Sequence, residues 1–327
     1  LTLNERYREP RLALGLCLRK IGRFDEAARH FSHIADTGVD LPSDWMEGVP
    51  SEDPPATVDS IRREVGEVRN SRAFVAEGIR SYHDGDLAAA FEQFSNAVEQ
   101  APNHPDLRCR KATVLGELGR MSEAIDELTV ALELNPSYEE ARLKRGVARL
   151  QLGSFLEAAQ DFDRVLKNGP SNDELELLHG IALLKGGQAE IAVPHLTTAT
   201  MSGNTAIRAA YFLSQAHVAL DRHDRAVAVL DAHPSPSNRV LQGKLLIEME
   251  SYEEAAATLE TALDQGERTP AVHLCLAQAR FSTGDAAVAL AHAKFALSDP
   301  TTSDDAAFLL ARVAFEGGND EQALHWL

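Results

Sequence analysis

The stretch Ser71–His104, SRAFVAEGIRSYHDGDLAAAFEQFSNAVEQAPNH, decides the fold of this chain of 327 residues. Apolar and small residues recur in it at helical spacing, and Gly85 interrupts them. Glycine can adopt the left-handed backbone conformation that ends a helix and reverses the chain. Pro102 ends the second helical segment, because proline cannot extend the preceding turn. The stretch therefore predicts two helices, each of about 12–14 residues, joined by a tight turn.

The same arrangement recurs along the chain, with a small residue followed by alanine twelve positions later. It occurs nine times, at Gly15–Ala27, Gly78–Ala90, Ala112–Ala124, Gly146–Ala158, Gly180–Ala192, Ser214–Ala226, Gly243–Ala255, Ala277–Ala289 and Ala311–Ala323. Between Ala112 and Ser214 the period is 34 residues each time. A fixed period in this range predicts stacked helix pairs, none of which can bury its apolar face alone.

The small residues are expected where the two helices of a repeat cross. Gly78 and Ala90 are such a pair, and a larger side chain there would overpack the crossing at a cost of about 1–3 kcal/mol. An apolar residue follows each alanine four positions later and is expected to fill the space between successive repeats. These residues are Phe94, Leu128, Phe162, Leu196, Leu230 and Leu259.

The pattern resembles that of the tetratricopeptide repeat (TPR) family, which has Leu-Gly in the first helix, Ala-x3-Phe in the second and proline at the end. The matching residues are Gly78, Gly85, Ala90, Phe94, Ala97 and Pro102, then Gly119, Ala124, Leu128, Ala131 and Pro136, then Gly153, Ala158, Phe162 and Pro170. Phe74, Arg108 and Arg142 stand where the family has tryptophan. The resemblance implies an all-α, right-handed α-solenoid superhelix of about nine TPR-like repeats, the last one truncated.

The period breaks twice. Gly15 and Gly78 are 63 residues apart, which leaves 29 residues beyond one period of 34. We expect an N-terminal repeat over 1–41, a proline-rich acidic loop over 42–56, an extra helix over 57–70 and the main solenoid over 71–327. The second break is a gap of 29 residues between Ser214 and Gly243.

At this second break, Pro234 and Pro236 predict that the preceding helix stops early, after residue 232 or 233. Asp221 takes the place of the glycine between the two helices. We expect a change of superhelical pitch near 233–238.

The formal net charge of −18 argues against sequence-independent binding of nucleic acid, which needs clustered lysine and arginine, and against an anionic membrane surface. It favours a basic or neutral partner, unless the acidity only keeps a long surface soluble. Three widely spaced cysteines suit a reducing compartment, and neither a signal peptide nor a membrane span is evident, so a cytoplasmic location is expected. The sequence begins at Leu1 without methionine and stops inside a helix, so we expect a fragment whose upstream signal or anchor would be missing.

In TPR proteins the first helix of each repeat lines a concave face on which partners commonly bind. The corresponding residues are Val75, Ile79, Tyr82, Leu143, Val147, Leu150, Leu177, Ile181, Leu184, Tyr211, Val218, Ile247, Phe281, Phe308 and Phe315. Cys109 and Thr113 hold the same positions in a further repeat. The apolar character of this set indicates a groove for a partner helix or apolar segment, unless the side chains pack against the adjacent first helix. Trp45 is a possible anchor, for another protein, for this groove or for its own loop.

The sequence offers no motif for catalysis, metal binding or cofactor binding: HExxH, CxxC and GxxxxGK[ST] are absent. We therefore expect a non-enzymatic scaffold or adaptor that binds another protein. Three alternatives remain open: the substrate-recruiting arm of a larger enzyme, a self-assembling structural protein, and a regulator whose Trp45 loop occupies its own groove.

Overall fold

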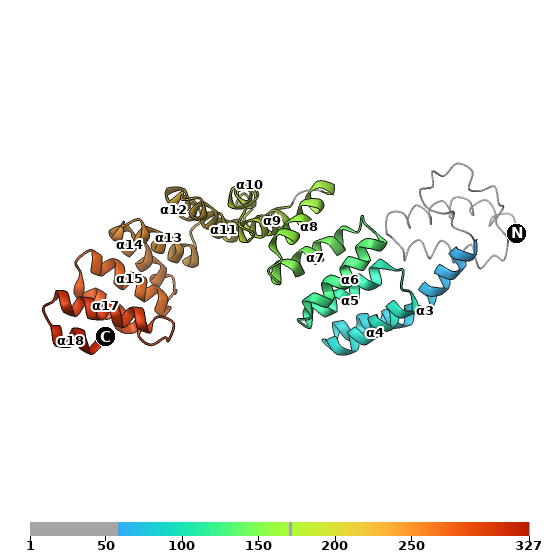
Figure 1. The fold of residues 1–327 in the computed structure, drawn as a ribbon, viewed down its shortest axis with the longest axis horizontal. Helices are drawn as coiled ribbons and strands as arrows, with labels where there is room; N and C mark the ends of the chain where they lie inside the picture. Colours follow the sequence, from blue (N-terminus) through green and yellow to red (C-terminus); the bar gives the residue numbers. More distant parts are fainter. Residues whose placement is uncertain (1–57, 170–171, 327) are drawn as a thin grey trace. The chain divides into compact units, whose positions relative to one another are not determined.

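The computed structural model describes residues 58–169 and 172–326, with side chains from Ser71 onward. Helices are the only regular structure in these residues, and there are 16 of them (Figure 1). The chain divides into two compact bodies, Leu1–Asn168 and Gly169–Leu327. The expected N-terminal repeat, the loop over 42–56 and Trp45 lie outside the described residues.

The first body contains α3 to α8 and the second contains α9 to α18. The bounds are α3 Val58–His83, α4 Leu87–Gln100, α5 Pro105–Glu117, α6 Met121–Leu134, α7 Glu139–Gln151 and α8 Phe155–Asn168. In the second body they are α9 Asp173–Lys185, α10 Ala189–Ala199, α11 Ala206–Ala219, α12 His223–Ala232, α13 Pro236–Glu248, α14 Tyr252–Asp264, α15 Pro270–Ser282, α16 Ala286–Ala296, α17 Ser303–Glu316 and α18 Asp320–Trp326.

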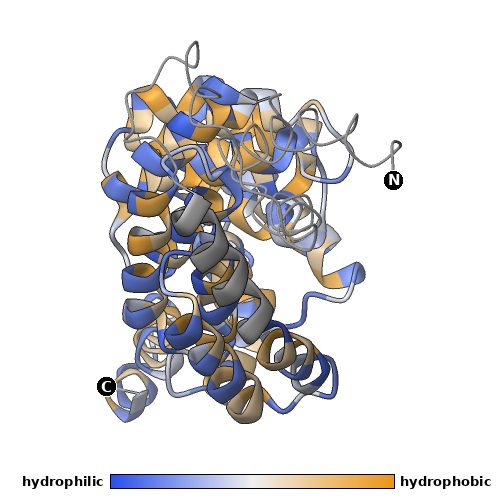
Figure 2. Ribbon diagram, turned by 90° about the vertical axis from the view of Figure 1, so that its right-hand side faces the viewer, coloured by the Kyte–Doolittle hydropathy of each residue, from blue (hydrophilic) through white to orange (hydrophobic). Residues whose placement is uncertain are grey.

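Within each body, every helix packs mainly against the helix before it and the helix after it. First helices of neighbouring repeats also touch, as α5 and α7 do in the first body and α13 and α15 do in the second. Hydrophobic and hydrophilic residues are mixed along the helices, as expected where one face of each is buried (Figure 2). The predicted all-α stack of helix pairs is confirmed.

Helix α3 is longer than the repeat requires. Residues 58–83 form one continuous helix, so the helix expected over 57–70 and the first helix of the repeat at Ser71 are a single element. No proline lies between these residues, and nothing in the local sequence forces the helix to end at residue 70.

The turns between paired helices share one left-handed residue. Gly85 has φ +80°, as predicted, and Asp221 adopts the same conformation with φ +58°. Glu250 is a second non-glycine residue of this kind, with φ +60°. The chain reverses identically at both acidic residues, since Arg222 N donates to His217 O and Ser251 N donates to Leu246 O, each over 2.8 Å.

Replacing Glu250 by glycine should stabilise the protein. A residue with a Cβ costs about 1–2 kcal/mol in the left-handed conformation, and glycine avoids this cost. Glycine also has more conformational freedom in the unfolded chain, which offsets about 0.4–1 kcal/mol of that gain. We expect Glu250→Gly to raise the free energy of unfolding by about 0.5–1 kcal/mol. Chemical denaturation followed by circular dichroism measures this change. Gly284 has φ +86°, so Gly284→Glu is the reverse substitution and should lower the free energy of unfolding. A loss of stability in Glu250→Gly would contradict the argument.

The short helix at the second break is confirmed. Helix α12 has 10 residues and ends at Ala232. Pro236 is the first residue of α13, where its missing N–H is no loss, and Ser235 Oγ accepts from Asn238 N over 3.1 Å. The expected change of pitch near 233–238 stays a prediction.

The apolar residues four positions after the alanines contact the following repeat, as predicted, and they also fill a second space that was not predicted. They cover the small residue of their own repeat: a Cβ on Gly243 would lie 2.5 Å from Leu259 Cγ. Some also reach the following repeat, because Leu128 shares one core with Ala141. These residues therefore close the crossing within a repeat and contact the next repeat with their remaining surface.

Polar pairs join the two helices of several repeats at one recurring position, and we call them the 19-residue pairs after their spacing. They are Arg108–Glu127, with Nη1 and Oε2 2.8 Å apart, Arg142–Asp161 at 4.0 Å, Glu176–His195 at 2.6 Å and His273–His292 at 2.7 Å. Two of the arginines are those that replace the family's tryptophan, and each also donates to a proline carbonyl at the end of the preceding repeat, Pro102 O and Pro136 O.

Candidate functional site

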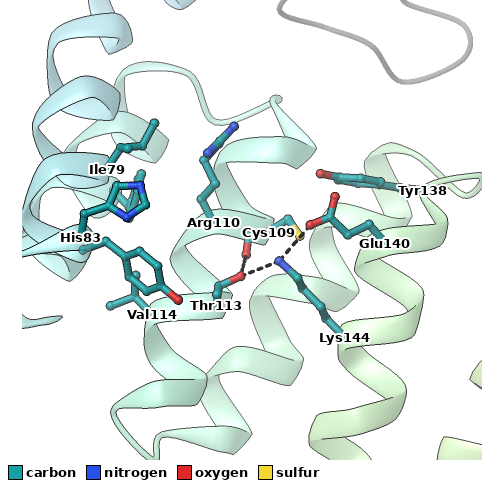
Figure 3. Close-up of a pocket in the computed structure, with 11 residues that line it drawn as sticks. Ile79, His83, Cys109, Arg110, Thr113, Val114, Tyr138, Glu140 and Lys144 are labelled. Atoms are coloured by element: carbon teal, nitrogen blue, oxygen red, sulfur yellow. Dashed lines mark hydrogen bonds and ion pairs between the residues drawn. The ribbon is translucent and has the colours of Figure 1, made fainter. Parts of the chain in front are cut away.

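A pocket of about 260 Å³ lies in the first body and is lined by three successive first helices (Figure 3). Its lining residues are Ile79, Tyr82 and His83 from α3, Phe94 from α4, Cys109, Arg110, Thr113 and Val114 from α5, and Tyr138, Glu140 and Lys144 from the start of α7. The spacing of the repeats explains the convergence: Cys109 and Thr113 stand one period after Val75 and Ile79. First helices of consecutive repeats thus share one hollow.

A polar network holds the lysine in this pocket. Thr113 Oγ1 donates to Cys109 O over 3.0 Å, and its oxygen accepts from Lys144 Nζ over 2.8 Å. Lys144 Nζ also lies 2.9 Å from Glu140 Oε1. The ammonium is therefore anchored to α5 by a neutral hydroxyl and to α7 by one carboxylate. Figure 3 shows Arg110 between the α3 side chains and those of α7.

The thiol and the phenol of the pocket stay protonated at neutral pH. Burial raises the pKa of the Cys109 thiol, and the Lys144 ammonium opposes part of this. Burial also raises the pKa of Tyr138 far above its ordinary value, with Cys109 beside it adding to the effect. A buried thiol with a raised pKa is a poor nucleophile. These two groups therefore suit packing and hydrogen bonding.

The rim of the pocket is tied together by Tyr82, whose hydroxyl donates to Glu117 Oε1 at the end of α5. This hydrogen bond to a carboxylate is the main cause of the raised pKa of Tyr82. Among the lining residues, Arg110 and Lys144 are cationic and Glu140 is anionic, and Glu117 adds a second carboxylate at the rim. The lining itself therefore carries one more positive than negative group, in a chain whose net charge is −18.

The residues of the sequence-predicted face differ in their location and in how far they are exposed. Ile79 and Tyr82 line the pocket, together with Cys109 and Thr113. Val75 packs on the core beneath α3 and α4. Val218, Ile247 and Phe281 are half-buried against cores of the second body, and Leu143, Val147, Leu150, Leu184 and Tyr211 are half-buried as well. Phe308 and Phe315 on α17 are 58% and 68% exposed.

Two predicted positions need correction. Leu177 is fully buried and Ile181 is 9% exposed, so a partner cannot contact them as an open groove would allow. Helix α9 packs against both α10 and α11, which explains why its apolar residues are covered. At these positions the alternative, packing against the neighbouring helices, is correct.

Sequence reasoning missed six pocket residues, namely His83, Arg110, Val114, Tyr138, Glu140 and Lys144. All but Val114 are charged, aromatic or polar, so an apolar pattern does not select them. Arg110 and Lys144 each follow a predicted position directly in sequence, which was the available signal.

Two kinds of site are not found in the described part of the chain. No three His, Cys, Asp or Glu side chains there are arranged to hold a metal ion. None of the helices in residues 58–169 and 172–326 combines the length and hydropathy that crossing a membrane requires.

Comparison with protein families identifies the repeats. The family described as "Tetratricopeptide repeat" matches residues 109–173 and 240–303, and the family "Anaphase-promoting complex, cyclosome, subunit 3" matches residues 185–262. This chain is a TPR protein. TPR proteins commonly mediate protein–protein interactions, and their fold is generally a non-enzymatic interaction scaffold.

Two solved structures with TM-scores above 0.5 agree on the fold of this TPR protein. A tetratricopeptide repeat protein from Parabacteroides merdae is 16% identical with a TM-score of 0.55, over 76% of this chain and 99% of that chain. The C-terminal part of a TPR repeat-containing protein from Cytophaga hutchinsonii is 14% identical with a TM-score of 0.57, over 66% and 92%. YrrB, described as a TPR protein with an unusual peptide-binding site, is 18% identical with a TM-score of 0.39, over 65% and 96%. No curated protein sequence matches the chain.

Proposed function

We propose that this TPR protein is a non-enzymatic adaptor that binds a peptide segment of another protein on the face formed by α3, α5 and α7. The observation that carries the proposal is the pocket, to which three successive repeats contribute side chains. A volume of about 260 Å³ suits one large side chain of a ligand rather than a folded domain. The neighbouring stretch of ligand would then cross the first helices.

The lining indicates which peptide would fit. The half-buried side chains of Ile79 and Tyr82 offer apolar contact above Val114 and Phe94, which are 1% and 3% exposed and form the floor, and this favours an aliphatic or aromatic anchor residue. Arg110 and Lys144 lie beside these groups, so a carboxylate next to the anchor would meet positive charge. At this site an acidic and apolar segment therefore fits better than the basic partner that the net charge of the chain favours.

A displayed library of random 12-residue peptides, selected on the full chain, tests the proposal. We expect enriched peptides to combine an aromatic or aliphatic residue with Asp or Glu. Lys144→Ala should weaken their binding about tenfold or more, because a hydrogen bond to a charged group contributes about 1.5–3 kcal/mol. Lys167→Ala is the matched control, since that lysine is exposed and pairs only with Asp163 over 2.6 Å. Equal affinity of the Lys144→Ala variant and the parent chain would refute this site.

The second body, taken by itself, carries further half-buried and exposed positions of the predicted face. Phe308 and Phe315 have the exposure that a contact with a partner requires. Tyr211 and Phe281 are the aromatic residues to truncate together there, with helicity measured beside affinity.

A further inference from the structure

Two histidine side chains of the second body contact each other through their Nδ1 atoms. His273 lies in the first turn of α15 and His292 lies on α16, and their Nδ1 atoms are 2.7 Å apart. The ring centroids are 5.0 Å apart, and the Phe295 ring covers His273 at 4.1 Å. They hold the position of the 19-residue pairs, where Arg108–Glu127 and Arg142–Asp161 pair a cation with an anion. One contact between α15 and α16 is therefore made by two imidazoles, a group that can take up a proton in mild acid.

The chemistry of the pair permits two protonation states and excludes a third. When both imidazoles are neutral, one Nδ1–H donates to the lone pair of the other Nδ1. A single added proton leaves one donor and one acceptor, so the hydrogen bond persists. Two added protons leave two N–H donors facing each other at hydrogen-bond distance, with like charges. The second proton therefore removes the bond and replaces it with repulsion.

We propose that His273 and His292 form a proton-operated latch, which holds α15 against α16 while at least one imidazole is neutral and releases the two helices when both are charged. Release would loosen the repeat in which Ala277, Ala293 and Leu310 form a shared core. The device is independent of the pocket in the first body. No residue of the pocket takes part in the pair.

The surroundings favour the neutral pair. Burial lowers the pKa of His273, and His292 and Arg268, which precedes α15, lower it further. Burial also lowers the pKa of His292, which Glu260 on α14 raises and Arg280 on α15 lowers. Arg280 and Glu260 are themselves hydrogen-bonded, so their effects on His292 largely offset each other. Among the described residues, α17 adds no charge that shifts either pKa.

The direction of the pH effect follows from these lowered pKa values. The stability that the neutral pair contributes is fully present above the pKa of free histidine, about 6.5, and is lost as the pH falls below it. Each proton taken up on release makes the equilibrium constant of opening rise tenfold per pH unit, so two protons give up to about 100-fold. His217 in α11 also has a pKa lowered by burial, so the test needs a local signal.

Trp326 provides that signal. It packs against the core that joins α15, α16 and α17, and Trp45 is the other tryptophan of the chain. Trp45→Phe leaves Trp326 as the single reporter. The centroid of the His325 ring lies 5.5 Å from that of Trp326, so the parent for the experiment also carries His325→Gln to remove quenching by this ring.

The experiment records the emission wavelength of Trp326 in the full-length parent from pH 8 to pH 5. We expect a shift to longer wavelength that is steeper than a single titration. His273→Gln with His292→Gln should abolish the pH dependence, and so should His273→Arg with His292→Asp, which copies the Arg142–Asp161 pair. The second variant covers the case in which the first fails to fold at pH 8. An unshifted parent, or a shift of equal size in the folded variants, would overturn the latch.

Discussion

Asp161→Ala is expected to destabilise the first body by about 3–5 kcal/mol, because it leaves one buried and two half-buried guanidinium groups without their counter-ion. The carboxylate side chain is 3% exposed and accepts from Arg145 Nε and Nη2 over 3.0 and 2.7 Å. Arg149 Nη1 donates to it over 2.6 Å, and Arg142 Nη1 lies 4.0 Å away. A single anion thus balances three arginines on the face of α7 that meets α8. Without it, their mutual repulsion remains in a site that water scarcely reaches.

Chemical denaturation followed by circular dichroism measures the effect, and the same helix supplies the control. Asp163 also forms an ion pair, but its partner Lys167 has a side chain that is 71% exposed. An exposed pair of this kind contributes about 0.2–1 kcal/mol, so Asp163→Ala should change stability little. Equal losses in the two variants would show that the arginine cluster does not depend on Asp161. Asp161→Asn should fall between them, because it keeps an acceptor and loses the charge.

Leu259→Ala should cost about 2–5 kcal/mol, and it should reverse the sign of a second substitution at Gly243. Leu259 is fully buried, and its Cγ and Cδ2 would lie 2.5 and 2.7 Å from a Cβ on Gly243. Gly243→Ala alone gains about 1 kcal/mol of helix propensity and loses about 1–3 kcal/mol to this overlap. When Leu259 is alanine, the overlap is absent and the added methyl group fills part of the cavity. Gly243→Ala should then stabilise the protein by about 1 kcal/mol.

A double-mutant cycle measures this reversal. Gly116 in α5 is the control, because a Cβ there meets no atom within 4 Å. Gly116→Ala should therefore stabilise by up to about 1 kcal/mol in either background. Additive effects at Gly243 and Leu259 would mean that the leucine does not occupy the space above the glycine.

The sequence predicts those parts of the fold that rest on local backbone requirements. The left-handed turn at Gly85, its replacement at Asp221 and the early end of α12 before Pro234 follow from glycine, from spacing and from proline. The continuity of α3 was missed, because the division at residue 70 came from counting periods and no residue there stops a helix. The position of Leu259 over its own glycine depends on how closely two helices approach, which an apolar pattern does not state.

The candidate site was predictable only in outline. Ile79 and Tyr82 are pocket residues because the repeat places them on a first helix facing the next repeat. Lys144 belongs to the pocket because a hydroxyl one period back, on Thr113, accepts from its ammonium. That contact depends on two helices meeting at a particular distance. The burial of Leu177 has the same origin, since the helices beside α9 decide whether its apolar side chain meets water.

The 19-residue pairs make neighbouring repeats sensitive to different properties of the solution. Added salt screens a charge pair such as Arg108–Glu127 only in part, because its side chains are 18% and 16% exposed, and it leaves two neutral imidazoles almost untouched. Two protons break His273–His292. Mild acid would therefore loosen the repeat formed by α15 and α16. Ionic strength and acidity become two separate means of selecting which stretch of the array opens first.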